Sequence, residues 1–406
     1  MQSDVFFSSA RTLIYKDSLA KIKGPFVLKN LGIAEKIKKN DKVAIKTHFG
    51  AEENTRYLRS SYIRFLCDYL EKFGAIPFVA ESCGWGLPGI KGEYGGRANE
   101  KEYLEVALKH GFTEETMGAR ILTLDGPVGI DYEIQKINGN RFNEVLVAGR
   151  LRKFDYLILA THFKGHPGAG FGGAIKNLGI GCVSKGGKVQ AHNGKKLEFD
   201  FSLCKENCEN CLKICTTSAL TKNKNKSLNF DKEKCKFYYM CKSVCEHEVI
   251  DIGGSTTEEF IVQMVDNALG VVERFGNEKF FYLNYAIDIT YQCDCSGGSD
   301  IPFISDIGVL SSLDPVALNQ ACVDLVHLSY MNPHSILGEI NVLKKDEKND
   351  WFSYIPRFNS ITKKIYLNLD GKASSLWEIQ LKAAEDIGLG TRNYNLTEVC
   401  PDKNDF

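Results

Sequence analysis

The first half of the chain alternates short apolar runs with amphipathic stretches, which is the pattern of repeated strand–helix units. Three of the apolar runs predict buried strands, and each ends at a polar side chain with catalytic potential: 42–47 at His48, 76–80 at Glu81 and 155–161 at His162. Because ligands bind outside the carboxyl ends of parallel strands, these three side chains mark a candidate site.

Helices are predicted where apolar side chains recur every three or four positions beside a capping residue. They cover 60–73 before Gly74, 100–110 before Gly111, 257–275 after a capping box from Thr256 to Glu259, 316–330 after Asp314-Pro315, and 374–387. Asn138-Gly139 predicts the turn of a hairpin, 279–290 a further strand, and the residues after Gly390 a polar tail. The body is therefore expected to be α/β, with a mostly parallel sheet.

Length and composition narrow the class of protein. The 406 residues exceed one ordinary domain of about 100–200 residues. Apolar residues at 43% and charged residues at 25% fit an ordered globular chain. Because 51 basic residues balance 51 acidic ones, a protein devoted to nucleic acid or anionic membrane is not expected. No apolar run reaches the roughly 18–20 residues that span a bilayer, and MQSDVFFSSARTLIY lacks a secretory pattern. We expect a cytoplasmic protein without a membrane span, and its oligomeric state is left open.

Cysteine clustering interrupts the α/β pattern. Seven of the fourteen cysteines lie between Cys204 and Cys245, in a segment poor in aliphatic residues. Clustered thiols in a reducing compartment indicate a metal site or catalysis rather than disulfides. The expected organisation is an α/β body formed by 1–198 and 253–406, with a small module inserted at 199–252.

The cysteine spacing resembles that of two-cluster ferredoxins, in which the fourth cysteine of each run ligates the cluster held by the other run. The runs here are Cys204-x3-Cys208-x2-Cys211-x3-Cys215 and Cys235-x5-Cys241-x3-Cys245. By this resemblance, Cys204, Cys208, Cys211 and Cys245 hold one [4Fe–4S] cluster. Cys215, Cys235 and Cys241 contribute to a second.

Two departures from the ferredoxin pattern affect the second cluster and the choice of metal. The first pair of cysteines is separated by three residues rather than two, and Tyr238 stands where the second run should have a cysteine. Three thiolates suit a [3Fe–4S] cluster, or a cube whose fourth iron has a non-cysteine ligand. Zinc is the competing metal, because short cysteine spacings also suit tetrahedral S4 sites.

A second constellation surrounds the predicted strand ends. His162, Lys164 and His166 follow one strand, Cys83 follows Glu81, and Arg56, Arg59 and Arg97 lie in nearby loops where a guanidinium can fork onto a carboxylate or phosphate. The glycine-rich segment 162–192 also carries Lys176 and His192, and Gly170 and Gly173 leave room for a ligand against the backbone. Isolated histidines and lysines are more often structural than catalytic. Cys182, Cys293 and Cys295 are further candidate ligands or ordinary reduced thiols.

The chain resembles the uncharacterised iron–sulfur centre proteins grouped as domain of unknown function 362. The matching motifs are THFGAEENTRYLR at 47–59, HFKGHPGAGFGGAIKNLGIGC at 162–182, the cysteine module, and CDCSGGSDIPFISDIGVLSSLDPVAL at 293–318. This resemblance implies an α/β fold and iron–sulfur clusters, but no particular reaction.

A more distant resemblance is to the nickel-pincer lactate racemases, which carry a His, then Gly-Phe-Ser-Gly-Gly-x-Lys, then a later His. His166, Gly170-Phe171, Lys176 and His192 stand at corresponding spacings, with Gly172 and Ala174 as departures. The resemblance implies that Lys176 anchors a cofactor, His192 ligates its metal and His166 acts as acid or base. Glu81 or His48 would replace the racemase's other catalytic histidine.

Three functional hypotheses follow from these features. The first is a redox enzyme whose clusters exchange electrons with a small molecule held by Glu81, His162, His166 and Lys176. The second is an electron carrier whose basic module, with nine lysines against four acidic residues between Cys204 and Cys245, docks an acidic redox partner protein. The third is a racemase-like enzyme with a metal or organic cofactor tethered at Lys176. A bare carrier does not need so large an α/β body, which favours the redox enzyme.

Overall fold

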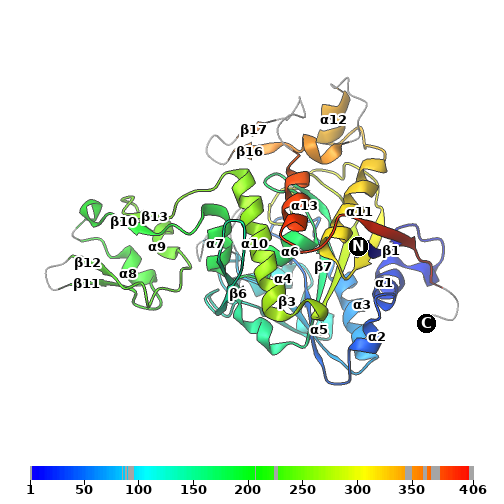
Figure 1. The fold of residues 1–406 in the computed structure, drawn as a ribbon, viewed down its shortest axis with the longest axis horizontal. Coiled ribbons are helices and arrows are strands. Elements are labelled where there is room, and N and C mark those ends of the chain that lie inside the picture. The colour runs from blue at the N-terminus through cyan, green and yellow to red at the C-terminus, as the bar shows by residue number, and fades with distance from the viewer. Residues whose placement is uncertain are drawn as a thin grey trace.

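A central sheet of eight strands organises the chain in the computed structural model (Figure 1). The structure describes residues 2–84, 86, 89, 96–205, 207–223, 227–342, 350–359, 364–366 and 375–401. In spatial order the strands are β18 (Tyr394–Glu398), β1 (Ser3–Ser9), β15 (Gly308–Ser312), β14 (Phe280–Ala286), β7 (Tyr156–His162), β2 (Lys42–Lys46), β3 (Ile76–Glu81) and β4 (Arg120–Thr123). All neighbours are parallel except β15, which is antiparallel to β1 and β14. The predicted α/β class with a mostly parallel sheet is confirmed.

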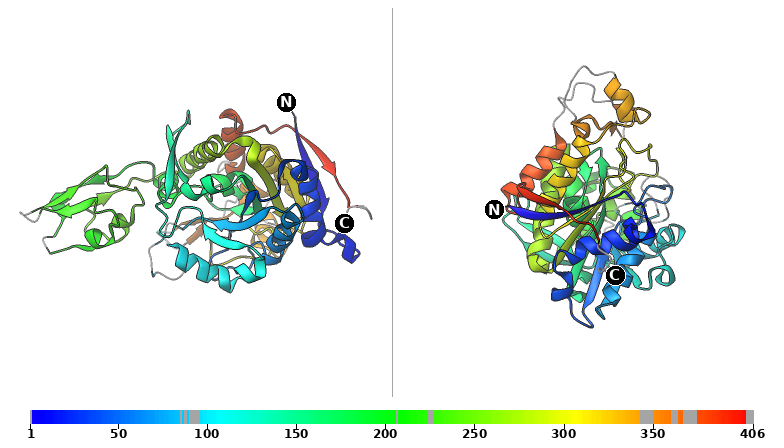
Figure 2. Two further views of the ribbon diagram at one scale, coloured as in Figure 1. Left: turned by 90° about the horizontal axis from the view of Figure 1, so that it is seen from below. Right: turned by 90° about the vertical axis from the view of Figure 1, so that its right-hand side faces the viewer.

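Helices cover both faces of this sheet (Figure 2). One face carries α1 (Gly24–Lys29), α2 (Ile33–Lys36), α3 (Ser60–Glu71), α4 (Glu100–Lys109) and α5 (Glu114–Met117). The other carries α6 (Ala174–Gly179), α7 (Lys185–Asn193), α10 (Thr257–Phe275), α11 (Pro315–Leu328) and α13 (Leu376–Asp386). Leu157 and Leu159 of β7 belong to one hydrophobic core, and Ile158 and Ala160 to the other, because successive strand side chains point to opposite faces. Of the described helices, none has the length and apolar character needed to cross a bilayer.

Most of the predicted elements are present. The predicted strands at 42–47, 76–80 and 155–161 are β2, β3 and β7. Thr256 and Glu259 form the expected reciprocal capping box of α10, and the Asp314 carboxylate caps α11 by accepting from the Val316 and Ala317 amides. The predicted helix at 374–387 is α13, although residue 374 itself lies outside the described residues.

Three elements differ from the sequence prediction. The strand predicted at 279–290 ends at Ala286, because the chain leaves the sheet through Asp288, whose φ is 47°. The tail that was expected to be merely polar contains β18, an edge strand whose side chains are mostly exposed and therefore show no apolar pattern. The predicted hairpin is present as β5 (Tyr132–Lys136) and β6 (Glu144–Ala148), but its loop spans 137–143 rather than a two-residue Asn-Gly turn.

The cysteine-rich segment forms a lobe that projects from the body (Figures 1 and 2). Its elements are β10 (Glu198–Phe199), α8 (Asn210–Ile214), β11 (Leu220–Lys222), β12 (Leu228–Phe230), α9 (Met240–Ser243) and β13 (Ile250–Asp251). Antiparallel pairing of β10 with β13 joins the two ends of the lobe at the neck. We refer to residues 199–252 as the cysteine module. The remaining peripheral elements are α12 (Ile336–Val342), β16 (Arg357–Asn359) and β17 (Lys364–Tyr366).

Candidate functional site

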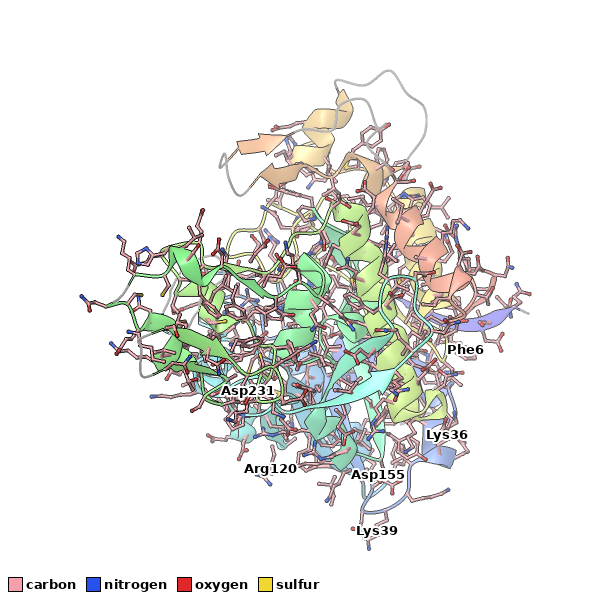
Figure 3. All side chains as sticks on the ribbon, turned by 60° about the vertical axis from the view of Figure 1, so that its left-hand side comes forward. Phe6, Lys36, Lys39, Arg120, Asp155 and Asp231 are labelled. Atoms are coloured by element: carbon pink, nitrogen blue, oxygen red, sulfur yellow. The ribbon has the colours of Figure 1, made fainter. Side chains whose placement is uncertain are left out.

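A cavity of about 680 Å³ opens at the carboxyl ends of β2, β3 and β7. Two short strands, β8 (Lys164–His166) and β9 (Gly170–Gly172), together with α6, α7 and the turn at 293–296, complete its wall. Figure 3 labels Lys39, Arg120 and Asp155, which lie near the opposite edge of the sheet, where β2, β4 and β7 begin. The cavity therefore occupies the edge at which parallel sheets bind ligands.

Most of the candidate residues from the sequence line this one cavity. They are His48, Glu81, Arg97, His162, Lys164, His166, Gly173, Lys176, His192, Cys293 and Cys295. Arg56 lies outside the lining and forms an ion pair with Asp288 at 3.6 Å. Gly170 also lies outside it, and a side chain there would collide with the backbone of Trp377.

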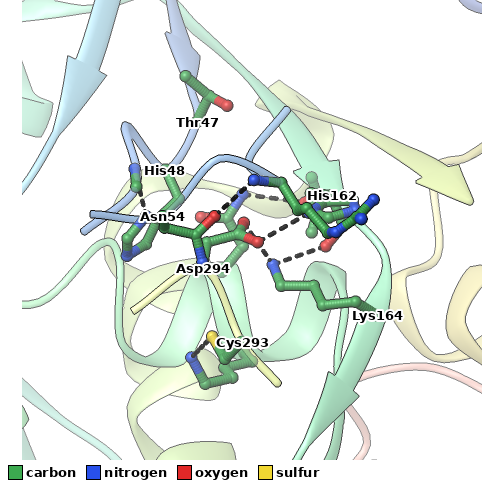
Figure 4. Close-up of polar contacts among 12 residues, drawn as sticks. Thr47, His48, Asn54, His162, Lys164, Cys293 and Asp294 are labelled. Carbon is green, nitrogen blue, oxygen red and sulfur yellow. Dashed lines mark hydrogen bonds and ion pairs between the residues drawn. The ribbon is translucent and has the colours of Figure 1, made fainter. Parts of the chain in front are cut away.

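Asp294 fixes the floor of the cavity through a buried charge network (Figure 4). One of its carboxylate oxygens is 2.8 Å from His162 Nδ1, and the other is 2.8 Å from Lys164 Nζ. Burial alone would raise the pKa of Asp294, but His162 and Lys164 outweigh it and lower the pKa to about 2. His162 Nε2 lies 2.7 Å from the Ile287 carbonyl, so both of its ring nitrogens are already engaged. His162 therefore orients the 293–296 turn and has no ring nitrogen directed at a ligand.

Cys293 is the most polarised thiol of the cavity. Its Sγ accepts from Lys176 Nζ at 3.4 Å. The hydrogen bond from Cys295 opposes the effect of burial, and together with the Lys176 charge it holds the pKa of Cys293 well below its ordinary value. Although burial alone would lower the pKa of Lys176, the Cys293 charge raises it above its ordinary value. The contact between Lys176 and Cys293 therefore favours the ammonium form of the lysine and the thiolate form of the cysteine.

Glu81 is held as a carboxylate by a neighbour that the sequence analysis did not select. Lys46 Nζ lies 2.7 Å from Glu81 Oε1 and donates to Asn177 Oδ1 at 2.7 Å. Burial raises the pKa of Glu81, but Lys46 and other nearby cations bring it below its ordinary value. In the sequence, Lys46 is marked only as a lysine that follows the three apolar residues 43–45 at the carboxyl end of β2.

Three cavity histidines are kept neutral by burial. Burial lowers the pKa of both His48 and His192 to about 4, and it also lowers that of His166. His192 Nδ1 donates to the Lys188 carbonyl at 2.8 Å, whereas His166 Nδ1 accepts from the Gly168 amide at 3.0 Å. The two rings therefore present opposite tautomers, which matters for any metal they would ligate.

Positive charge dominates the cavity wall. Five cationic side chains line it, against Glu81 as the one carboxylate among the described lining residues: Lys46, Arg97, Lys164, Lys176 and Lys188. Arg97 is only 6% exposed, and its Nη2 donates to the Cys295 carbonyl at 3.1 Å. Its Nε has no hydrogen-bond partner among the described residues. Lys46, Lys164 and Lys176 already face Glu81, Asp294 and Cys293, and burial lowers the pKa of Lys188. Arg97 is therefore the lining cation that can fork onto a small anion.

Helix α7 connects the cavity to the cysteine module. Lys188 and His192 point into the cavity. Gly186 packs tightly against the Phe237 carbonyl, and Gln190 Nε2 donates to the Tyr239 hydroxyl at 3.3 Å. Because helical residues advance by about 100° each, these two pairs lie on opposite faces of α7. The module thus contacts the outer face of the helix whose inner face lines the cavity, at a separation of about one helix diameter, ~10 Å.

The seven module cysteines gather into two sets, which we call the first and the second cysteine set. The first comprises Cys204, Cys208, Cys211 and Cys245, which line one small cavity. The second comprises Cys215, Cys235 and Cys241, whose charges interact across the module. Burial raises the pKa of Cys215, but amides that include those of Leu220 and Thr217 donate to its sulfur and bring it below its ordinary value. The Phe237 amide likewise donates to Cys235 Sγ at 3.3 Å.

Comparison with known proteins identifies the family. The family model described as "Domain of unknown function (DUF362)" matches residues 43–324, well over half of the chain. The chain belongs to this family. A comparison with curated proteins finds no match.

Two solved structures align with this chain at low sequence identity and low TM-score. The lactate racemase apoprotein from Thermoanaerobacterium thermosaccharolyticum aligns over 100% of this chain and 84% of its own, with 11% identity and a TM-score of 0.38. A structural-genomics protein from Thermotoga maritima aligns over 66% of this chain and 51% of its own, with 10% identity and a TM-score of 0.33.

Proposed function

We propose that this chain is an iron–sulfur redox enzyme, in which clusters in the cysteine module exchange electrons with a small anion bound in the cavity. The observation that carries the proposal is the position of α7, which has the module on one face and the cavity on the other. A carrier without its own reaction needs no polar cavity of this size behind its clusters. An enzyme, in contrast, requires a continuous path for electrons from the cysteine module to the cavity.

The arrangement of the module supports clusters of the ferredoxin type. The charges of Cys204 and Cys211 interact with that of Cys245 from the other run, and Cys215 interacts with Cys235 and Cys241. This exchange of the last cysteine between runs is the ligation scheme of two-cluster ferredoxins. Amide donation to the sulfur of Cys215 lowers its pKa and favours the thiolate, which is the form that binds metal. At Cys235, burial outweighs the Phe237 amide and raises the pKa of the thiol. We assign a [4Fe–4S] cluster to the first set and a three-cysteine cluster to the second.

Tyr238 provides a test of the second cluster. Its hydroxyl accepts from the Thr216 amide at 3.3 Å and donates to the Ile214 carbonyl, so the phenol is committed to the backbone beside Cys215. Tyr238→Cys adds a fourth thiolate at this position. We expect iron to rise from about seven to about eight atoms per chain, as conversion of a [3Fe–4S] cluster to a cube requires.

Tyr238→Phe is the matched control, because it removes the same hydroxyl without supplying a thiolate. Its iron content should stay at the wild-type value. Equal iron in the Cys and Phe variants would contradict a three-cysteine second cluster, and the measurement is iron and acid-labile sulfide per chain after anaerobic purification.

Arg97 provides the test of substrate binding. Dithionite-reduced protein is mixed in a stopped-flow instrument with a panel of small carboxylated and phosphorylated electron acceptors. An enzyme should be reoxidised by at least one of them. Arg97→Met should slow that reaction about ten- to a hundredfold, the effect of losing one charge-assisted hydrogen bond, and Arg97→Lys should retain much of the rate. Oxidation by an acidic redox protein alone, unaffected by Arg97→Met, would favour the carrier.

The third hypothesis, a cofactor tethered at Lys176, has one observation in its favour. Lys176, His166 and His192 line the same cavity, as the racemase resemblance implies. The contact between Lys176 and Cys293 argues against it, because it raises the pKa of Lys176, and covalent attachment requires the free amine. An unmodified mass for the Lys176 peptide would remove this candidate.

A further inference from the structure

We propose that Cys293 and Cys295 form a redox-active dithiol–disulfide pair on the floor of the cavity. The pair would take up electrons two at a time, whereas an iron–sulfur cluster passes them singly. The source of these electrons rests on the proposed function, but the chemistry of the pair does not.

A tight turn brings the two thiols together. The Ser296 amide donates to the Cys293 carbonyl at 2.9 Å, which closes a turn with Asp294 and Cys295 at its centre. Both cysteines are free thiols, and their sulfurs lie within 4.8 Å of each other and of a ring nitrogen of His166. Residues two apart in such a turn fall within the range of about 4.4–6.8 Å between Cα atoms that a disulfide spans. The pair can therefore be bridged without rebuilding the surrounding fold.

The surroundings of Cys293 prepare it as the attacking thiolate. The side chain is 3% exposed, and Lys176 Nζ donates to its sulfur at 3.4 Å. His166 lies on another side of the sulfur: its Nδ1 accepts from the Gly168 amide, so the neutral form of the ring carries its proton on Nε2, and a ring nitrogen lies within 4.8 Å of the Cys293 sulfur. A cysteine that lines a cavity beside a lysine and a histidine has the accessible, electropositive surroundings of a reactive thiol.

The tautomer of His166 favours a disulfide pair over a metal site. His166, Cys293 and Cys295 also have the composition of a three-ligand metal site. A metal-bound histidine, however, donates its other ring N–H to an acceptor. His166 Nδ1 instead faces an amide donor, so binding a metal through Nε2 would require the ring or the Gly168 peptide to turn. The observed geometry favours thiol chemistry.

The redox step is balanced within the pair. The Cys293 thiolate and the Cys295 thiol form one S–S bond, and their two electrons and the single proton of Cys295 pass to an oxidised small anion bound in the cavity, which is the two-electron acceptor. In the reverse direction, two electrons and one proton from solvent in the cavity restore the thiolate and the thiol; reduced clusters in the cysteine module would supply these electrons one at a time. Asp294, locked by His162 and Lys164, keeps the turn in place through both states.

The test uses the full chain, purified anaerobically and equilibrated in dithiothreitol buffers of graded oxidised-to-reduced ratio. Samples are alkylated in acid and mapped by mass spectrometry. The expected result is a reversible disulfide within the 293–295 peptide, while the buried thiol of Cys182 stays alkylatable throughout after unfolding. Lys176→Met should slow alkylation of native Cys293 by about tenfold or more, since it removes the charge that stabilises the thiolate.

Two results would overturn the proposal. One is a 293–295 peptide that remains fully reduced across the whole buffer series. The other is one equivalent of tightly bound metal that is lost in both Cys293→Ser and Cys295→Ser. Repeating the titration in Cys241→Ser separates this proposal from the proposed function. If the pair still cycles with dithiothreitol, the dithiol proposal is supported. If dithionite-reduced clusters in the wild-type chain nevertheless fail to reduce it, the electron path of the proposed function is contradicted.

Discussion

Replacing Cys208 and Cys211 together with serine is expected to remove the first cluster and to unfold the cysteine module, while the α/β body stays folded. The reason is that the module has only a small core of its own, which includes Leu220, Met240 and Ile250. Neither of the two hydrophobic cores formed by the described residues includes a side chain from 199–252. In so small a unit, cluster binding supplies the folding free energy. Iron should fall by about four atoms per chain.

Hydrogen exchange measures the two parts of this prediction separately. Amides of the module should lose protection, whereas those of β7 and β14 should keep it. Cys67→Ser is the matched control, because Cys67 is a buried thiol of α3 on the far side of the sheet from α7. Its iron content should be unchanged. A module that remains protected after losing its iron would show that the cysteines are not what holds it together.

Asp294→Ala is expected to destabilise the body by about 3–5 kcal/mol, the usual cost of removing one partner from a buried ion network. The substitution leaves Lys164 without its carboxylate and His162 without one of its two partners. Because folding lowers the pKa of Asp294 to about 2, its contribution is complete above about pH 4 and is lost as pH falls toward 2. Urea unfolding at several pH values should therefore show the difference between variant and wild type shrinking below pH 4.

Asp288→Asn is the control for that measurement. Asp288 also pairs with basic side chains, Arg56 and Arg59, but the Arg59 side chain is 55% exposed. Exposed ion pairs contribute less than about 1 kcal/mol. Equal effects of the two substitutions would contradict the assignment of Asp294 as the anchor of the cavity floor.

The sequence predicts the site best where chemistry coincides with strand ends. His48, Glu81 and His162 each follow an apolar run, and the rule that parallel strands end at one edge places them in one cavity. Lys176 and His192 were located through glycine-rich spacing, and they line the same wall. Arg56 lies outside the cavity lining and pairs with Asp288, and the sequence does not show that these two residues are neighbours.

The residues that were missed depend on contacts between distant parts of the chain. Asp294 stands between two cysteines in the sequence, but its role comes from contacts with Lys164 and His162, some 130 positions earlier. Lys46 acquires its role from Glu81 and Asn177. The short strand β18 is not predicted, because an exposed edge strand buries too few side chains to show an alternating apolar pattern. Contacts of this kind depend on the chain topology, and the local periodicity of apolar residues does not predict that topology.

The central claim is that the cysteine module carries iron–sulfur clusters that can deliver electrons to the cavity. Its most direct test is quantification of iron, acid-labile sulfide and zinc in the anaerobically purified full chain, with electron paramagnetic resonance spectra before and after dithionite. Two clusters predict about seven or eight iron atoms with comparable sulfide, and signals from two distinct centres. Stoichiometric zinc without inorganic sulfide, and no signal in either state, would contradict the claim.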